Sequence, residues 1–117
     1  MNNRSFGAAG ERAAEAHLAA RGALLLARNY RCRFGEIDLI ARMEGKIVFV
    51  EVKRRANFAH GAPAQAVTIQ KQRRIALTAS CYLRENALAD APVRFDVVEV
   101  TPSGVRHIPA AFYPPQT

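Results

Sequence analysis

The clearest pattern in the chain is a pair of hydrophobic segments joined by a short polar turn. Residues 35–43 alternate between two faces, as a half-buried strand does. Residues 46–54 are rich in Val and Ile, and their IVFV run predicts a strand that is buried on both faces. Because Glu44 and Gly45 suit a two-residue turn, we predict a β-hairpin. Its first strand would place Ile37, Leu39 and Ala41 on one face and Glu36, Asp38 and Ile40 on the other.

Helical and extended patterns flank this hairpin. Residues 6–21 are rich in Ala and other helix formers, which predicts a first helix. Gly22 would end it, because glycine is common just past the end of a helix. Residues 68–88 carry apolar side chains at three- and four-residue steps, which predicts a second helix. Further strands are predicted at 23–30, 93–100 and, as a short last strand, 105–108, with a loop at 54–67 and an irregular or surface-docked tail. The order α-β-β-β-α-β, with that extra strand, predicts a single α/β domain over residues 1–117, a mixed sheet flanked by helices.

The predicted register of the hairpin brings four charged residues together. With a turn of two or four residues, Asp38 lies opposite Glu51, and Glu36 lies opposite Lys53, all on one face at the open end of the hairpin. A three-residue loop or a bulge would shift these pairs. Like charges directly opposite each other destabilise a sheet, so the Asp38–Glu51 pair calls for a neutralising partner.

Two arrangements would relieve the repulsion between Asp38 and Glu51. One carboxyl could hold a proton, or a divalent cation could lie between the two, since Mg²⁺ commonly takes one or two carboxylates plus waters and a substrate phosphate. Lys53, on the same face, would lower the cost of the acidic cluster. The alternative is a solvated edge hairpin whose charges are explained by a Glu36–Lys53 pair. Against it, the face that holds Glu51 and Lys53 also holds Phe49, so that face begins buried.

The composition narrows the choice of partner. Lys and Arg number 17 against 10 Asp and Glu, which gives a net charge of +7, and half of the chain is hydrophobic, enough for a real core. This balance favours an anionic partner, for which nucleic acid is the usual candidate. Because we find no apolar leader and no run of about 18 apolar residues, we expect a cytoplasmic protein without a membrane partner. Cys32 and Cys81 lack metal-binding spacing and are expected to be free thiols.

Four segments together resemble a known family, namely GAAGERAAEAHL, RNYRCRFGEIDLIA, VFVEVKRR and RFDVVEV. Over nearly the whole chain they resemble the YraN family of bacterial proteins, which is similar to archaeal Holliday junction resolvases. Asp38 followed by Glu51-Val52-Lys53 also resembles the Asp…Glu-x-Lys core of the PD-(D/E)xK nuclease superfamily, although Ile37 stands where that name has proline. The resemblance implies a restriction-endonuclease-like fold, whose α-β-β-β-α-β core agrees with the predicted order.

The resemblance implies roles for the charged residues of the hairpin. By position, Asp38 and Glu51 would be metal ligands and Lys53 would be the catalytic lysine. Glu36 belongs to the family's Gly-Glu-Ile-Asp motif, where it would act either as a ligand or as a partner of Lys53. The cofactor implied by this set is Mg²⁺ or Mn²⁺.

The resemblance also implies a glutamate from the first helix. Glu11 is the better match, because it follows Gly10 as in the family's Gly-Glu pair. Independently, Glu11 shares a helical face with Leu18, a stripe that looks inward. Glu15 lies near the same face and stays an alternative.

These observations predict a metal-dependent, endonuclease-like protein that acts on DNA rather than RNA. By analogy with junction resolvases, branched DNA is the expected substrate and a homodimer the expected assembly. The basic residues expected to contact the nucleic acid are Arg31, Arg33, Arg54, Arg55, Lys71, Arg73 and Arg74. Two alternatives remain, a nucleic-acid-binding module that does not cut and an adaptor that keeps the acidic cluster for folding.

Other polar residues are assigned structural roles. Asp96 is expected to form an ion pair with Arg94, two positions earlier in the same strand. The three histidines, His17, His60 and His107, are scattered, and no spacing pairs them with a cysteine or with each other.

Overall fold

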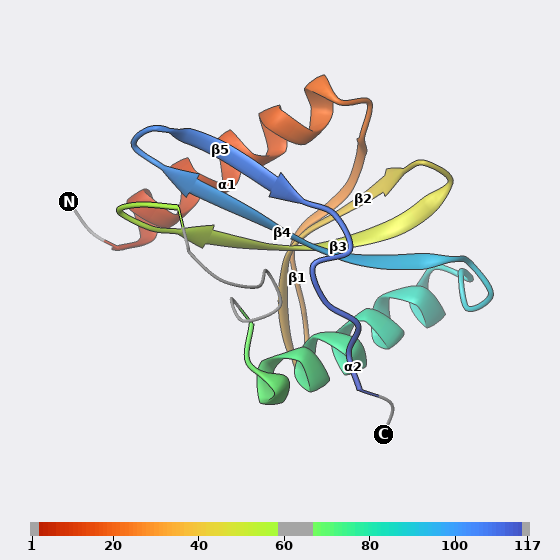
Figure 1. Cartoon of the computed structure of the whole chain (residues 1–117). Helices are drawn as coiled ribbons and strands as arrows, with labels where there is room; N and C mark the ends of the chain where they lie inside the picture. Colours follow the sequence, from red (N-terminus) through yellow and green to blue (C-terminus); the bar gives the residue numbers. More distant parts are fainter. Residues whose placement is uncertain (1–2, 59–66, 116–117) are drawn as a thin grey trace.

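The computed structural model describes residues 3–58 and 67–115 as a mixed α/β fold (Figure 1). The elements are α1 (Asn3–Ala20), β1 (Leu24–Cys32), β2 (Gly35–Met43), β3 (Lys46–Arg54), α2 (Ile69–Glu85), β4 (Val93–Thr101) and β5 (Gly104–Ile108). This order confirms the predicted α-β-β-β-α-β succession and the short last strand. Most of the predicted loop 54–67, with His60, lies outside the described residues.

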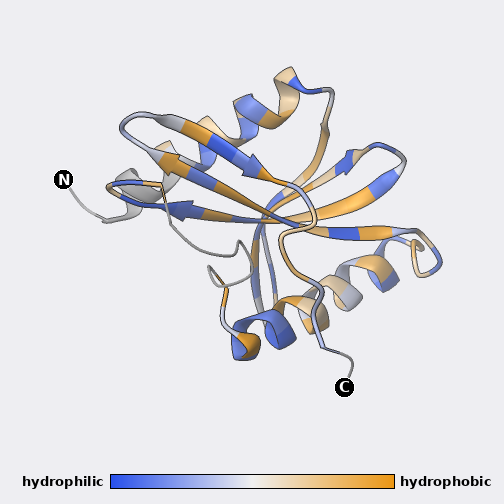
Figure 2. Cartoon of the chain, viewed as in Figure 1, coloured by the Kyte–Doolittle hydropathy of each residue, from blue (hydrophilic) through white to orange (hydrophobic). Residues whose placement is uncertain are grey.

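The sheet has five strands in the order β1-β2-β3-β4-β5. All neighbours are antiparallel except β3 and β4, which are parallel because α2 crosses over between them. The two helices pack on opposite faces of this sheet (Figure 1). Hydrophobic stretches concentrate in the central strands, whereas the first turns of α2 are hydrophilic (Figure 2). No described helix is long and apolar enough to cross a membrane.

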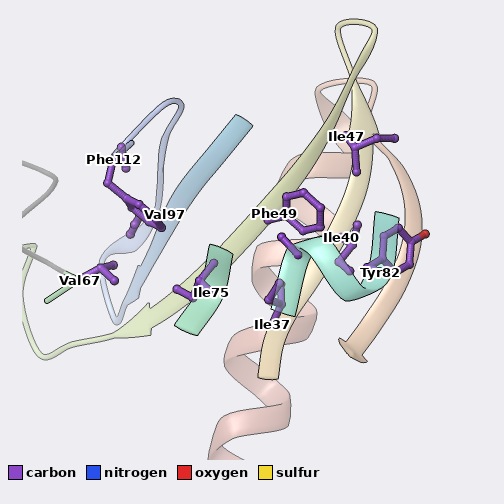
Figure 3. Packing of buried hydrophobic residues seen from close by; sticks show 11 residues of the cluster. Ile37, Ile40, Ile47, Phe49, Val67, Ile75, Tyr82, Val97 and Phe112 are labelled. Atoms are coloured by element: carbon purple, nitrogen blue, oxygen red, sulfur yellow. The ribbon is translucent and has the colours of Figure 1, made fainter. Parts of the chain in front are cut away.

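Two apolar clusters form the core, one on each side of the sheet. Ala14 and Leu18 of α1 pack against Val48 and Val50 of β3 on one side. On the other side the α2 residues Ile75, Ala79 and Tyr82 pack against Ile40, Ile47 and Phe49 (Figure 3). The IVFV run of β3 therefore contributes to both clusters, as its continuous hydrophobicity predicts.

The hairpin turn and its register agree with the sequence prediction. Glu44 and Gly45 both adopt positive φ, 54° and 76°, which is the conformation of a type I′ turn. Met43 pairs with Lys46, and the ladder continues without a shift to Leu39 and Val50.

Beyond Leu39 and Val50 the two hairpin strands separate. β2 stays paired with β1 as far as Gly35 and Cys32, while β3 stays paired with β4 as far as Arg54. In Figure 1 the end of β1 and the start of β2 accordingly run toward α2, and the end of β3 turns away from them. We call this separation of β2 from β3 the fork. The continuous ladder predicted through Asp38–Glu51 and Glu36–Lys53 is therefore wrong, because each strand follows its outer neighbour.

The fork also corrects the predicted faces of β2. Ile37 belongs to the cluster under α2, together with Ile40, whereas Leu39 belongs to the cluster under α1. The expectation that Ile37 and Leu39 share one face is wrong, because strict alternation does not hold across the point where β2 leaves β3. Figure 3 shows the Ile37 side chain beside Ile75 of α2.

The helix ends differ from the sequence prediction by a few residues. Helix α1 begins at Asn3 and ends at Ala20, and Gly22 adopts a φ of 91° just beyond it, as expected for a C-terminal glycine. Helix α2 begins after Thr68, whose hydroxyl accepts the Lys71 N–H, and it ends at Glu85 rather than residue 88.

Strand β4 carries two buried acidic residues outside the hairpin. Asp96 is fully buried and accepts two hydrogen bonds from Arg94, both at 2.9 Å, which confirms the predicted ion pair. His107 of β5 lies 2.7 Å from the same carboxylate, and the Ala110 N–H donates to it. Glu99, also buried, pairs with Arg106. These carboxylates are therefore neutralised within the fold.

Candidate functional site

A cleft of about 370 Å³ opens at the fork. Its walls come from the start of β2, the end of β3 and the first turns of α2, namely Gly35, Glu36, Asp38, Glu51, Thr68, Lys71, Arg74 and Ile75. Asp38 comes to this cleft from β2 and Glu51 comes to it from β3. The two carboxylates predicted to meet by register thus still share a site, although no ladder joins their strands there.

Asp38 is held in an electrostatically unfavourable position. Burial raises the pKa of its carboxyl to about 7, and the charges of Glu51 and then Glu11 act in the same direction. The Val52 N–H donates to Oδ2 of Asp38 at 2.8 Å, and Lys71 lies near, but these favourable interactions do not offset the burial. Near neutral pH the carboxyl is therefore easily protonated, or stabilised as the anion by an added cation.

Glu51 is neutralised by a residue that the sequence did not place in the site. The Lys71 Nζ lies 2.8 Å from Oε1 of Glu51, whose side chain is only 8 % exposed. Lys71 was expected to contact nucleic acid, and it comes from α2, twenty positions further along the chain. No local pattern marks this contact, because it depends on how α2 docks on the sheet.

Lys53 lies close to Asp38 and Glu51 but does not pair with Glu36 as the predicted register requires. Its side chain is partly buried, and burial lowers the pKa of its ammonium, as does the charge of Lys71. The charges of Glu51 and Asp38 act in the opposite direction, which places Lys53 in the field of both. The predicted Glu36–Lys53 pair is wrong, because Glu36 instead forms an ion pair with Arg31 at 3.3 Å.

The structure distinguishes the two glutamates of α1. Arg28 donates two hydrogen bonds, of 2.6 and 2.9 Å, to the carboxylate of Glu15, and Glu15 does not line the cleft. Glu11 does not line the cleft either, but its charge is near enough to help raise the pKa of Asp38. With its amide nitrogen turned toward the carboxylates, Asn29 donates to Glu11 at 3.0 Å and to Glu36 at 3.2 Å. Asn29 thus links Glu11 of α1 to Glu36 of β2, and the sequence analysis did not identify it.

The donor chemistry of the cleft suits a hard divalent cation. Asp38 and Glu51 supply carboxylate oxygens from two strands, and the raised pKa of Asp38 signals negative charge that is not fully balanced. Within residues 3–58 and 67–115, no three His, Cys, Asp or Glu side chains converge into a complete ligand cluster. Two carboxylates with open positions match Mg²⁺ better than a closed protein cage, because Mg²⁺ usually keeps several waters.

The predicted basic contacts divide into two groups. Arg74 lines the cleft, and Arg73 and Arg54 are exposed. Arg54 crosses α1 at Gly10, where a β-carbon would overlap its side chain. Three further arginines make specific contacts within the fold: Arg31 pairs with Glu36, Arg55 lies 3.8 Å from Glu99, and Arg33 stacks over Phe34.

The two cysteines are free, as predicted, yet they are not independent of each other. The Cys81 thiol lies within hydrogen-bonding reach of Cys32, and the Phe34 N–H donates to the Cys32 Sγ at 3.4 Å. Although burial acts to raise it, the pKa of Cys32 is lowered by these hydrogen bonds.

Comparison with known proteins places the chain in a family. Residues 10–100 match the family model described as "Uncharacterised protein family UPF0102". A UPF0102 protein of Lachnoclostridium phytofermentans is 50% identical over 113 residues, which cover 96% of each chain. A UPF0102 protein of Clostridioides difficile is 45% identical over 96% of this chain and 100% of its own.

A further relative and one solved structure complete the comparison. The UPF0102 protein of Symbiobacterium thermophilum is 53% identical over 86% of this chain and 85% of its own. SfsA of Pyrococcus furiosus, solved in complex with Ca²⁺, is 17% identical with a TM-score of 0.37, over 92% of this chain and 62% of that one. That likeness is weak and assigns neither site nor activity. From the family model and these relatives, the chain belongs to the UPF0102 family, also called YraN.

Proposed function

We propose that the cleft at the fork binds a divalent cation, Mg²⁺ or Mn²⁺, and that the protein hydrolyses phosphodiester bonds of DNA. The observation that carries this proposal is the Asp38–Glu51 pair, two carboxylates from separate strands that face one cleft with unbalanced charge. A purely structural sheet gains nothing from that arrangement, because both burial and like charge destabilise it.

The residues around the cleft would divide the work. Asp38 and Glu51 would hold the cation, which when bound supplies an acidified water and offsets charge on the phosphate. Glu11 would add negative charge from α1 and, through Asn29, fix the position of Glu36. Lys53, whose pKa is lowered by burial, would contact a phosphate oxygen or accept a proton at Nζ.

The charge around the cleft supports a phosphodiester substrate. Arg74 lines the cleft and Arg73 is exposed beside it, on a helix whose first turn has no acidic residue. Cations on the surface would hold the backbone of the nucleic acid, while the acidic residues within the cleft hold the metal. The +7 net charge of the chain is consistent with this division.

A second candidate function is a nucleic-acid-binding module that does not cut. It is favoured by the Lys71–Glu51 ion pair, which already neutralises one of the two carboxylates, and by the lack of a three-residue ligand cluster in the described ranges. Cleavage that depends on a metal distinguishes the two candidates.

The experiment is a single-turnover cleavage assay of the wild type and Lys53→Ala on duplex, single-stranded and branched DNA, with Mg²⁺, Mn²⁺ or chelator. We expect Lys53→Ala to cut about a hundred- to a thousand-fold more slowly, by analogy with the loss of one charge-stabilising donor. Its melting temperature should stay close to that of the wild type, because a partly exposed charge pair contributes only about 0–1 kcal/mol.

Lys46→Ala is the matched control, a lysine on the same strand at the turn end of the hairpin. It should melt and cut like the wild type. Cleavage by Lys53→Ala at the wild-type rate would remove Lys53 from the mechanism. If the wild type cuts none of the substrates, the second candidate function, a nucleic-acid-binding module that does not cut, replaces the nuclease proposal.

A further inference from the structure

Lys71 is the residue in the cleft that the predicted mechanism does not use. Its ammonium is 2.8 Å from a carboxylate oxygen of Glu51, and its side chain is 43 % exposed while that of Glu51 is 8 % exposed. The contact is therefore made at the cleft wall, between a buried carboxylate and a cation that solvent can reach.

The position of Lys71 on α2 is unfavourable for a cation. Lys71 lies in the first turn of the helix, where the Thr68 hydroxyl accepts its backbone N–H, and that turn has no acidic residue. The exposed N–H groups of a helix start carry partial positive charge, so they repel a lysine there. Helix stability does not explain the residue, whereas the Glu51 carboxylate does.

Lys71 is also placed to reach a second anion. Arg74 follows it by three positions, so the two side chains lie on one face of α2, and both line the cleft. A lysine binds a carboxylate as a single flexible point charge rather than through a fixed fork, so it can leave one oxygen and move to another. A phosphate in the cleft would offer such an oxygen beside Arg74.

We propose that Lys71 is the resident counter-cation of Glu51, which a divalent cation displaces and which then contacts the phosphate of the bound nucleic acid. The inference rests on the proposed function and adds an order of events to it. Without metal, Lys71 neutralises Glu51. A divalent cation would compete with Lys71 for Glu51, and the released ammonium would join Arg74 on the substrate. Lys71 therefore opposes metal binding while it favours substrate binding.

Opposite effects of one substitution test this idea. Lys71→Met keeps most of the apolar stem and removes the charge, so it should bind Mn²⁺ more tightly in calorimetric titration, roughly tenfold, within the range typical of coupled ligands. In Ca²⁺, the same variant should bind a short DNA duplex more weakly. Lys71→Arg, which keeps the charge, should keep the weaker Mn²⁺ affinity of the wild type, and Lys46→Met should change neither quantity.

Stability gives a readout that does not depend on activity. In chelator, Lys71→Met should melt at a lower temperature than the wild type, because Glu51 is left buried without its partner, and Mn²⁺ should raise its melting temperature more than it raises that of the wild type. If Lys71→Met does not fold in chelator, Lys71→Gln, which can still donate a hydrogen bond to Glu51, replaces it in both measurements.

The outcomes separate this inference from the proposed function. If the wild type binds Mn²⁺ and the charge-removing variant binds it no more tightly, Lys71 does not compete and the inference is overturned while the metal site stands. An Asp38→Asn/Glu51→Gln variant must lose the Mn²⁺ heat, which assigns that heat to the cleft. If neither the wild type nor the Lys71 variants bind Mn²⁺, both proposals fail.

Discussion

At the scale of single residues, Asp38 is the clearest sign of a functional site, because its carboxyl lies in an electrostatically unfavourable position. Its backbone lies in a strand, yet its side chain is half-buried near Glu51, and its backbone donor is the Val52 N–H. A carboxyl in such a place lowers the stability of the protein whenever it is ionised. The loss of folding stability caused by ionised Asp38 can therefore be measured without any knowledge of the substrate.

We expect Asp38→Asn to stabilise the protein in chelator at pH 8. The pKa of Asp38 is about 7 in the folded protein and 3.8 in a model peptide, so the folded state binds more protons between these values. The stability of the wild type should thus fall as pH rises through this window, whereas asparagine does not titrate. Denaturant unfolding should show a gain of about 1–3 kcal/mol at pH 8 that disappears toward pH 4. Equal stability of the two proteins at pH 8 would contradict the raised pKa.

Residue chemistry near the turn could be read from the sequence, whereas contacts made by distant elements could not. Alternation and turn type were enough to bring Asp38 and Glu51 to one site, since both lie within a few residues of a hairpin whose register is fixed locally. Lys71 and Asn29 escaped prediction, because each reaches the cleft only through the docking of another element. The pairing of Glu36 with Arg31 escaped it as well, because it follows from the fork.

At the scale of elements, the strands were predicted more closely than the way they separate. Both hairpin strands have the predicted bounds, since each is a continuous pattern that ends at Gly35, at the turn or at Arg54. The fork could not be predicted from the hairpin alone. It depends on the pairing of β2 with β1 and of β3 with β4, and both pairings continue where the ladder between β2 and β3 ends. The parallel β3–β4 pair is made by residues more than forty positions apart, and no local signal specifies it.

The buried charges of β4 and β5 form an element of the fold that is separate from the cleft. We expect Asp96→Asn to destabilise the protein by about 3–5 kcal/mol, because Arg94, whose side chain is 12% exposed, would keep its charge without its partner. Burial acts to raise the pKa of Asp96, but hydrogen bonds from His107 and Arg94 outweigh it and hold the pKa below the usual value.

Denaturant unfolding at pH 7 measures this effect, with the exposed Asp90→Asn as the control that should change little. If Asp96→Asn unfolds like Asp90→Asn, the carboxylate does not hold β4 and β5 together. A loss of stability as pH falls below about 4 should accompany the wild type only, because the lowered pKa makes the ionised form the stabilising one.

At the scale of the whole molecule, exposed arginines lie at both ends of the sheet. Arg73 and Arg74 lie at the fork end, whereas Arg21 and Arg42 lie at the opposite end, where β1 begins and β2 ends. All four are exposed. The two pairs have equal charge, so they separate the effect of position from that of net charge.

We expect the Arg73→Ala/Arg74→Ala double variant to bind DNA more weakly and to flatten the dependence of affinity on salt. Each lost phosphate contact removes about 0.9 from the logarithmic salt slope, so the loss of both contacts should lower it by about 2. Arg21→Ala/Arg42→Ala should leave affinity and slope nearly unchanged. Fluorescence anisotropy at several salt concentrations measures both quantities, and equal slopes for the two double variants would place the nucleic acid elsewhere.

The fork has a mechanical consequence for this fold. Asp38 belongs to the ribbon made by β1 and β2, and Glu51 belongs to the ribbon made by β3 and β4, so no backbone ladder sets the gap between them. The hydrogen bond from the Val52 N–H to Oδ2 of Asp38 joins the two ribbons, and the rest of the gap follows the angle at which they diverge from Leu39 and Val50. Any ligand held by both carboxylates would fix the angle between the two ribbons. Conversely, a change of side-chain volume at Leu39 or Val50 would tune the site from a distance, without touching a charged residue.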